Sequence, residues 1–466
     1  MLTYDLNRRG KTPIYDYLYR CIKQDIISGE IQAHEQLPSK RSLARHLNIG
    51  VITVANAYAQ LLMEGYIYSL ERQGYYAQNV ENHQTKKLPE FTIEETDLHD
   101  HEFFVDFKAN RTSLQHFPAS IWNKYMREAL SLQDPILLKT VPYNGLYALR
   151  QTIANYLLRN RGMQVQPSQI IIGAGTEYLY SRLLQLFGRD SIFAIEDPGY
   201  KKFAIIAASY GNDFKYIPID GFGLMIDKLD ESGADIVHVS PANHFPTGTV
   251  MPIKRRLELF EWAGQARERF IIEDDYDSEF RYTGKIILPL YTEDTQEKVI
   301  YMNTFSKSLV PSLRISFMVL PPKLLERYVD TMSFYSCTVS SFEQYTLARF
   351  ISEGHFERHL NQMKNYYKEK RALILEAIKN SPLAKISKII ERNAGTHFLL
   401  NVRTELSDEQ IFEAGLKRDM YLSFFSDYSY SKSSPEGYST LVMNYAGIAK
   451  DKIADAVQRL SKIFLS

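Results

Sequence analysis

The sequence of 466 residues contains only two cysteines, Cys21 and Cys337. Two cysteines are too few for a disulfide framework, which favours a reducing, cytoplasmic setting. No apolar run reaches the roughly 18 residues that a membrane-spanning helix needs, so no membrane segment is predicted. No apolar stretch follows the basic cluster near the N-terminus, which argues against a secretory signal peptide. No metal site is predicted either.

The chain also lacks net charge, because 55 Lys and Arg residues balance 55 Asp and Glu residues. The charges are unevenly distributed. Residues 1–80 carry nine basic and seven acidic side chains, whereas residues 81–102 carry two and seven. A slightly basic segment followed by an acidic one indicates a chain of at least two parts, and a length of 466 residues agrees with more than one domain.

The first 80 residues have the pattern of a small helical domain. Apolar residues recur at helical spacing from Ile14 until Gly29, which predicts a first helix. Ser39 is a candidate N-cap for a second helix, and a third runs through "GVITVANAYAQLLM" until Gly65. The alternating stretch "YIYSLERQGYYAQ" then predicts a hairpin that turns around Gln73 and Gly74. Three helices and a hairpin outline a winged helix-turn-helix domain of α+β class.

Residues 81–103 are polar and charged without any period, so they are predicted to form a linker. From Phe104 to Ser466, short apolar runs alternate with amphipathic helices. This alternation predicts an α/β domain built around a mostly parallel sheet, with a smaller α+β subdomain at its C-terminal end. Ligands of such sheets bind at the carboxyl ends of the strands.

Two predicted strand ends carry polar residues of interest. In "IIIGAGTEYL", backbone N–H groups of Gly175, Thr176 and Glu177 are predicted to form an anion site at a helix start. An ordinary strand-to-helix turn is the simpler explanation for this stretch by itself. In "FIIEDDYDSEF", Asp274 and Tyr276 are predicted to point to the same side of an extended chain. A solvated acidic loop is the simpler explanation for this second stretch by itself.

A third strand end, "YMNTFSKSLVPSLR", supplies the amine of Lys307. A lysine forms a Schiff base with an aldehyde, and pyridoxal phosphate also needs a carboxylate, an anion cradle and an aromatic face. Asp274 fits the carboxylate and Tyr200 in "EDPGY" fits the aromatic face. The cradle candidates are Gly175, Thr176, Thr304, Ser306 and Arg314. Together these residues favour pyridoxal 5'-phosphate as the cofactor.

With these motifs, residues 104–466 resemble the fold-type I, pyridoxal-phosphate-dependent transferases, and residues 12–78 resemble the GntR-type winged helix. The two parts in this order resemble the MocR/GabR subfamily of transcriptional regulators. The resemblance implies that Lys307 forms the internal aldimine and that Asp274 binds the pyridine nitrogen. It also implies that Tyr276 contacts the ring hydroxyl, that Tyr200 stacks on the ring, and that Thr304 and Arg314 hold the phosphate.

Several positions depart from the family pattern. Gly447 stands where GABA-sensing regulators carry an arginine for the ligand carboxylate, and Lys202 matches a second such arginine. Lys202 lacks the bidentate fork of arginine, and a solvent-facing helix lysine is an equally good explanation for it. Phe245 occupies the position of an asparagine near the ring hydroxyl, so Asn243 and His244 are the alternatives for that role. The effector is therefore predicted to differ from GABA.

The DNA-binding candidates lie on the second and third predicted helices and on the hairpin. Lys40 and Arg41 at the start of the second helix suit phosphates, and Thr53 and Asn56 lie near the groove-facing end of the third. Arg72 lies at the predicted hairpin tip. Because the net positive charge is small, single-domain binding is expected to be weak, and a homodimer is predicted to bind double-stranded promoter DNA.

Two functions follow from these features. The first is a regulator that senses an amine, an amino acid or a vitamin B6-related ligand without catalytic turnover. The second is a working aminotransferase that carries a DNA-binding domain. Gly447 favours the first because turnover needs an anchored substrate, while Lys307 and Asp274 keep slow half-transamination compatible with the sequence.

Overall fold

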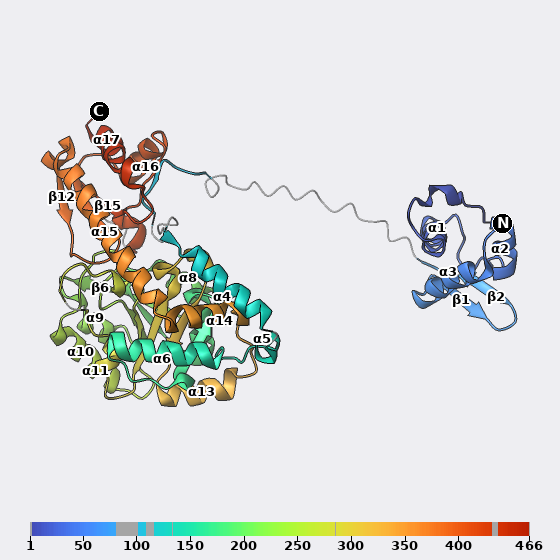
Figure 1. Cartoon of the computed structure of the whole chain (residues 1–466), viewed down its shortest axis with the longest axis horizontal. Coiled ribbons are helices and arrows are strands. Elements are labelled where there is room, and N and C mark those ends of the chain that lie inside the picture. The colour runs from blue at the N-terminus through green and yellow to red at the C-terminus, as the bar shows by residue number, and fades with distance from the viewer. Residues whose placement is uncertain are drawn as a thin grey trace. The chain divides into compact units, whose positions relative to one another are not determined.

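The chain divides into two compact units, residues 1–100 and 101–466, each with its own core (Figure 1). A computed structural model describes residues 2–80, 101–108, 116–132, 134–284, 286–430 and 437–465. Most of the predicted linker, residues 81–100, lies outside the described residues. No helix within the described residues is long and apolar enough to cross a membrane.

The N-terminal unit is a winged helix-turn-helix domain. Its elements are a 3-10 turn (Leu6–Arg9), α1 (Ile14–Ser28), α2 (Lys40–Leu47), α3 (Val51–Met63), β1 (Ile67–Leu70) and β2 (Gly74–Ala77). Helix α1 ends at Gly29, whose φ of 82° is left-handed and suits glycine. The hydroxyl of Ser39 accepts a hydrogen bond from the Ser42 backbone N–H and caps α2, as predicted.

The two strands of this unit pair antiparallel, with Leu70 opposite Gly74. Gly74 therefore begins β2, and the turn consists of residues 71–73. This places the turn slightly earlier than the predicted Gln73–Gly74 position.

The C-terminal unit is built on an eight-stranded sheet with the order β4-β11-β10-β9-β8-β5-β6-β7. Six strands are parallel, whereas β11 and β7 run antiparallel to their neighbours. The strands are β4 (Ile170–Gly173), β5 (Phe193–Asp197), β6 (Phe214–Asp220), β7 (Gly223–Leu224), β8 (Ile236–Val239), β9 (Phe270–Asp274), β10 (Val299–Thr304) and β11 (Ser316–Val319).

Helices cover both faces of this sheet, because alternate residues of each strand enter different apolar clusters. In β4, Ile170 and Ile172 pack with α6 and α14, whereas Ile171 packs with α7 and α13 on the other face. The helices are α4 (Ala119–Ser131), α5 (Pro135–Leu138), α6 (Tyr147–Arg161), α7 (Thr176–Phe187), α8 (Lys201–Ser209), α9 (Ile226–Glu231), α10 (Ile253–Gly264), α11 (Leu290–Glu293), α12 (Phe305–Ser308), α13 (Pro322–Met332) and α14 (Ser341–Ser352).

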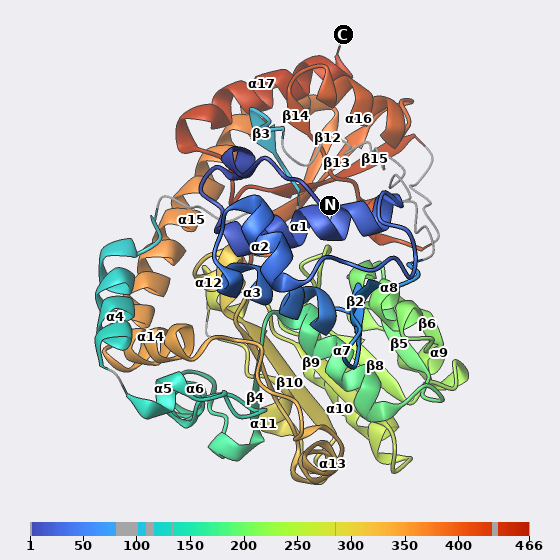
Figure 2. The ribbon, with the colours of Figure 1, turned by 90° about the vertical axis from the view of Figure 1, so that its right-hand side faces the viewer.

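A smaller α+β subdomain ends the chain, as the sequence predicted. Its antiparallel sheet has the order β12-β13-β15, and its helices lie beside that sheet (Figure 2). The elements are α15 (His355–Lys379), β12 (Ser387–Ile390), β13 (His397–Arg403), α16 (Asp408–Leu416), β14 (Met420–Tyr421), β15 (Tyr438–Asn444) and α17 (Ile453–Phe464). Strand β14 pairs with β3 (Val105–Asp106), which ties the start of the unit to its end.

Candidate functional site

A cavity of about 210 Å³ opens where parallel strands β4, β5, β8, β9 and β10 end and the C-terminal subdomain begins. Both the strand ends and the subdomain contribute side chains to it. Its lining residues are Thr176, Glu177, Tyr200, Lys202, Ser240, Phe245, Asp274, Tyr276, Thr304, Ser306, Lys307, Pro311, Arg314, Thr396, His397, Tyr428 and Asn444. Nine of the ten residues predicted to hold the cofactor belong to this set; the tenth, Gly175, lies beside it.

Lys307 lies on α12, the single turn that follows β10. Burial lowers the pKa of its amine, and the negative charge of Asp277 offsets part of that effect. The hydroxyl of Thr304 accepts the backbone N–H of Ser306 at 3.1 Å and the hydroxyl of Ser316 at 2.8 Å. These bonds fix the turn that carries Lys307. The lowered pKa favours the neutral amine, which is the nucleophilic form.

Asp274 is the last residue of β9 and is largely buried. The hydroxyl of Tyr180 donates to Oδ2 of Asp274 at 2.9 Å. Among the described residues, no group hydrogen-bonds Oδ1 of Asp274 or the hydroxyl of Ser306, although both atoms are buried. Buried acceptors are normally paired, so both atoms suit a ligand held in the cavity.

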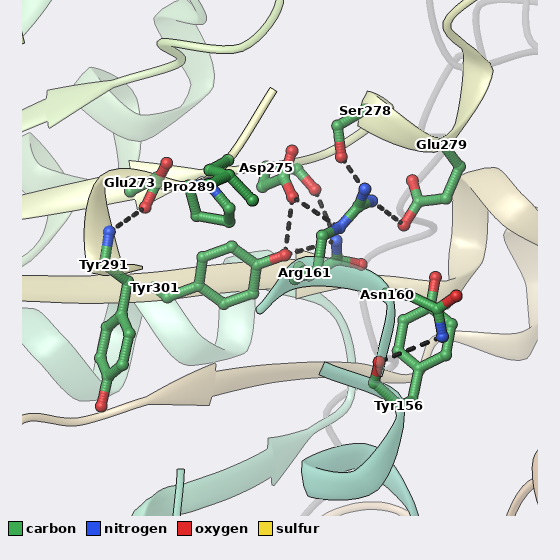
Figure 3. Close-up of polar contacts among 12 residues, drawn as sticks. Tyr156, Asn160, Arg161, Glu273, Asp275, Ser278, Glu279, Pro289, Tyr291 and Tyr301 are labelled. Atoms are coloured by element: carbon green, nitrogen blue, oxygen red, sulfur yellow. Dashed lines mark hydrogen bonds and ion pairs between the residues drawn. The ribbon is translucent and has the colours of Figure 1, made fainter. Parts of the chain in front are cut away.

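A buried ion-pair network anchors the acidic segment that follows β9 (Figure 3). Arg161, only 1% exposed, lies 3.7 Å from Asp275 and donates to Glu279 at 2.8 Å. It also donates to the hydroxyl of Ser278 at 2.6 Å, and Tyr301 donates to Asp275 at the same distance. The network holds both sides of Tyr276 and so fixes the direction in which Asp274 and Tyr276 point.

Glu177 pairs with two of the cationic side chains that line the cavity, Lys202 and Arg314. Its carboxylate accepts from Lys202 Nζ at 2.5 Å and also pairs with the guanidinium of Arg314. Burial raises the pKa of Glu177, but the Lys202 hydrogen bond and the Arg314 charge outweigh it and lower the pKa. Gly175 has a φ of 93°, a backbone conformation that suits glycine, and a Cβ there would press against the guanidinium of Arg314.

The predicted anion site at the start of α7 is only partly as expected. The N–H of Gly175 donates to the carbonyl of Gly173 at 2.9 Å and is therefore occupied. Thr176 and Glu177 are the first two residues of the helix, whose N–H groups have no partner within the helix itself. Two of the three predicted donors therefore remain for a ligand.

Tyr276 and its neighbours form the inner side of the site. The hydroxyl of Tyr276 donates to the carbonyl of Asn243 at 2.9 Å, and burial raises the pKa of that phenol. The amide of Asn243 donates to both oxygens of Asp277 at 2.9 Å. Burial raises the pKa of Asp277 to about 7, against the opposing effects of the Asn243 hydrogen bond and the Lys307 charge.

Three predicted effector residues do not line the cavity. Asn243 is bound to Asp277 as described, and Gly447 is exposed outside the lining. His244 is buried, with Nδ1 2.8 Å from Thr247 Oγ1. Its Nε2 lies 3.6 Å from Glu196, but this is no ion pair. Burial lowers the pKa of His244 to about 3 and raises that of Glu196 to about 8, so both are neutral at pH 7.

Sequence reasoning named Phe245 only as a departure from the family pattern, and it missed the lining residues that distant segments contribute. Phe245 follows β8, and Tyr428 comes from the C-terminal subdomain. His397 and Asn444 lie directly opposite each other at the ends of β13 and β15. The polar residues within "GTHFLL" and "LVMNYAG" were the available signal, but their pairing depends on strand register rather than on local sequence.

In the N-terminal unit, Arg41, Asn56 and Arg72 are exposed, whereas Lys40 and Thr53 are half-buried. Lys40 Nζ lies 4.9 Å from the ring centre of Tyr75. None of these three basic side chains pairs with a carboxylate among the described residues. In the first turn of α3, the apolar side chain of Ile52 is also 77% exposed.

Comparison with known proteins identifies both parts of the chain. Residues 105–460 match the family described as aminotransferase class I and II, and residues 14–76 match the gntR family of bacterial regulatory proteins. The chain is 37% identical to YdeL, an uncharacterized HTH-type transcriptional regulator of Bacillus subtilis, over 98% of each chain.

Two further matches extend this result. The chain is 28% identical to the probable rhizopine catabolism regulatory protein MocR of Rhizobium meliloti, over 99% of this chain and 96% of that protein. A crystal structure of kynurenine aminotransferase from Pyrococcus horikoshii matches with a TM-score of 0.69 and 23% identity. The match covers 79% of this chain and 92% of that one, and it supports the type I aminotransferase fold of the C-terminal unit.

Proposed function

The chain belongs to the GntR-type transcriptional regulators of the MocR/GabR kind, with an aminotransferase class I and II domain, and we propose that it responds to a small amine through pyridoxal phosphate. In this proposal the winged helix binds promoter DNA and the cavity of the C-terminal unit binds cofactor and ligand. Ligand binding changes the relative stability of two states of the protein, and these states differ in DNA affinity.

The observation that carries the proposal is the buried amine of Lys307 in a cavity that also holds two unpaired polar atoms, Asp274 Oδ1 and Ser306 Oγ. When bound, pyridoxal phosphate supplies an aldehyde for amines and an electron-withdrawing ring. The unpaired carboxylate oxygen of Asp274 suits a protonated ring nitrogen, and the buried Lys307 suits covalent attachment because burial favours its neutral form.

The remaining lining residues are assigned to the other parts of the cofactor. We assign Tyr200 to the aromatic face of the ring and Tyr276 to the contact with the ring hydroxyl, since both line the cavity. The phosphate is assigned to the N–H groups at the start of α7 and to hydroxyl and guanidinium groups, from Thr176, Glu177, Thr304, Ser306 and Arg314. Gly175 serves this group by leaving room for Arg314.

The scarcity of arginine in the cavity lining favours a regulatory role over catalytic turnover. Arg314 is the only arginine among the described residues that line it, and Arg314 already pairs with Glu177. An aminotransferase must hold the carboxylate of its substrate in a fixed geometry. The absence of a second arginine from this lining removes the bidentate anchor that such positioning uses.

The DNA-binding half of the proposal rests on α2, α3 and the wing. Lys40 and Arg41 at the start of α2 suit phosphates, and Arg72 at the wing tip suits the backbone or minor groove. Thr53 and Asn56 lie on the helix that this fold places in the major groove. The exposed side chain of Ile52 on the same helix suits the methyl group of thymine.

The test replaces the lysine. Lys307→Ala is expected to remain folded and to lose the visible absorbance of the lysine-bound cofactor after dialysis. It is also expected to lose any effect of amines on promoter binding in gel-shift assays. Lys323→Ala, at an exposed lysine on α13, is the matched control and should keep both properties. Retained colour in Lys307→Ala would remove the cofactor assignment, and enzyme-like multiple turnovers by the wild type would favour an aminotransferase.

A further inference from the structure

We propose that the ligand sensed by this cavity is a primary amine with a neutral, aromatic or apolar body, and that a carboxylate on the ligand weakens binding. This inference rests on the proposed function and names the ligand class of the same site. It follows from the part of the lining that is not assigned to the cofactor. The residues concerned are Lys202, Phe245, Thr396, His397, Tyr428 and Asn444.

Three aromatic rings form the outer wall. The Phe245 ring packs edge-to-face against Tyr428 at 4.7 Å between centroids, with an interplanar angle of 89°. It packs against His397 at 5.0 Å and 61°. Phe245 thus lies between the rings of His397 and Tyr428, and all three rings line the cavity. Such a wall favours ligands with flat, apolar groups.

This wall carries no positive charge at neutral pH. Burial lowers the pKa of His397 to about 4, and the nearby Lys307 charge adds to that effect. His397 Nε2 lies 3.1 Å from the carbonyl of Pro246, so this nitrogen carries a proton, and with its pKa lowered the ring carries no second proton at pH 7. Thr396 and Asn444 complete the wall with neutral polar groups. A ligand carboxylate would therefore find hydrogen-bond donors but no free cation here.

The cationic side chains of Lys202 and Arg314, which line the cavity, already pair with the same carboxylate. Lys202 and Arg314 both pair with Glu177, so the three side chains together carry one positive charge. A bound phosphate group carries about two negative charges at this place. The balance is negative, which attracts the ammonium form of an incoming amine and repels a ligand carboxylate.

The experiment compares two matched pairs of probes on the full-length protein loaded with pyridoxal phosphate. The pairs are 2-phenylethylamine with phenylalanine, and butylamine with 4-aminobutanoate. Only the second member of each pair has a carboxylate. It replaces a hydrogen atom of 2-phenylethylamine and the terminal methyl group of butylamine. We expect each carboxylate-free amine to change the visible spectrum at a concentration at least about tenfold lower than its partner, equivalent to about 1.4 kcal/mol. We also expect 2-phenylethylamine to change the spectrum at a lower concentration than butylamine.

Two variants locate the effect. Asn444→Arg adds a cation to the wall and should improve binding of phenylalanine and 4-aminobutanoate, whereas Asn444→Gln changes size without charge and should not. Phe245→Leu should weaken 2-phenylethylamine by about threefold to tenfold and leave butylamine unchanged, because only the phenyl group gains from the aromatic wall.

The outcomes separate the two proposals. If phenylalanine or 4-aminobutanoate acts at the lower concentration, the ligand class is wrong while the proposed function stands. If the protein takes up no pyridoxal phosphate, or if no amine changes its spectrum, the proposed function fails and this inference fails with it.

Discussion

The hydroxyl of Tyr180 donates to Oδ2 of Asp274 at 2.9 Å, while Oδ1 of the same carboxylate has no partner among the described residues. One oxygen is thus held in place by a phenol on α7, and the other is available to the cavity. This arrangement fixes the carboxylate at the end of β9 and leaves one of its oxygens for a ligand.

The first prediction concerns this carboxylate. Asp274→Asn is expected to weaken pyridoxal phosphate binding by at least about tenfold, because an amide cannot balance a protonated ring nitrogen. Titration of the apoprotein with cofactor, followed by absorbance, measures the change. Asp213→Asn, an exposed carboxylate after α8, is the control and should bind the cofactor like the wild type. Equal affinities of the two variants would contradict the role of Asp274.

The second prediction concerns the buried network of Figure 3. Arg161→Met leaves Asp275 and Glu279 without their counter-charge, so we expect a loss of about 3–5 kcal/mol in the stability of the C-terminal unit. Urea unfolding of the full-length protein measures this loss. Arg159→Met, at an exposed arginine of the same helix, should change stability by less than about 0.5 kcal/mol. Similar unfolding midpoints for both variants would show that the network is not stabilising.

Much of the fold was predictable because its signals are local. The N-cap at Ser39, the helix stop at Gly29 and the apolar runs that end at Gly173, Asp274 and Thr304 can each be recognised within a few residues. Parallel strands bring their carboxyl ends to one edge of the sheet, so nine predicted cofactor residues line one cavity.

The rest of the site was not predictable because it depends on long-range packing. Glu177 meets Lys202 and Arg314 only through the tertiary arrangement of α7, α8 and the loop after α12. His397 and Asn444 face each other because of one strand register. A shift of that register by one residue would turn both side chains to the opposite face. Local sequence likewise gave no sign that Asp277 would bind Asn243.

The third prediction concerns pH. Burial raises the pKa of Glu196 from 4.5 to about 8, so the folded protein retains a proton that the unfolded chain releases in this range. Raising the pH between these values therefore favours unfolding, by about 1.4 kcal/mol per pH unit from this group alone. Glu196→Gln should remove that part of the slope and keep an oxygen for the N–H of Ser240.

Unfolding free energies measured at intervals from pH 5 to about pH 8 test this expectation. Glu261→Gln, at an exposed glutamate of α10, is the matched control and should leave the slope as in the wild type. Parallel pH profiles for the wild type and Glu196→Gln would show that Glu196 does not carry the proton.

The last prediction concerns the DNA-binding face. Lys40→Ala combined with Arg41→Ala should weaken promoter binding and lower the slope of log affinity against log salt by about two, because each phosphate contact releases about one counterion. Fluorescence anisotropy with an operator obtained by in vitro selection measures both quantities. Arg20→Ala is the control, since Arg20 on α1 already pairs with Asp16 at 2.8 Å and should leave the slope unchanged. A double variant with the wild-type salt slope would mean that α2 does not contact the phosphates and that other basic side chains, such as Arg72 at the wing tip, carry the charge contacts instead.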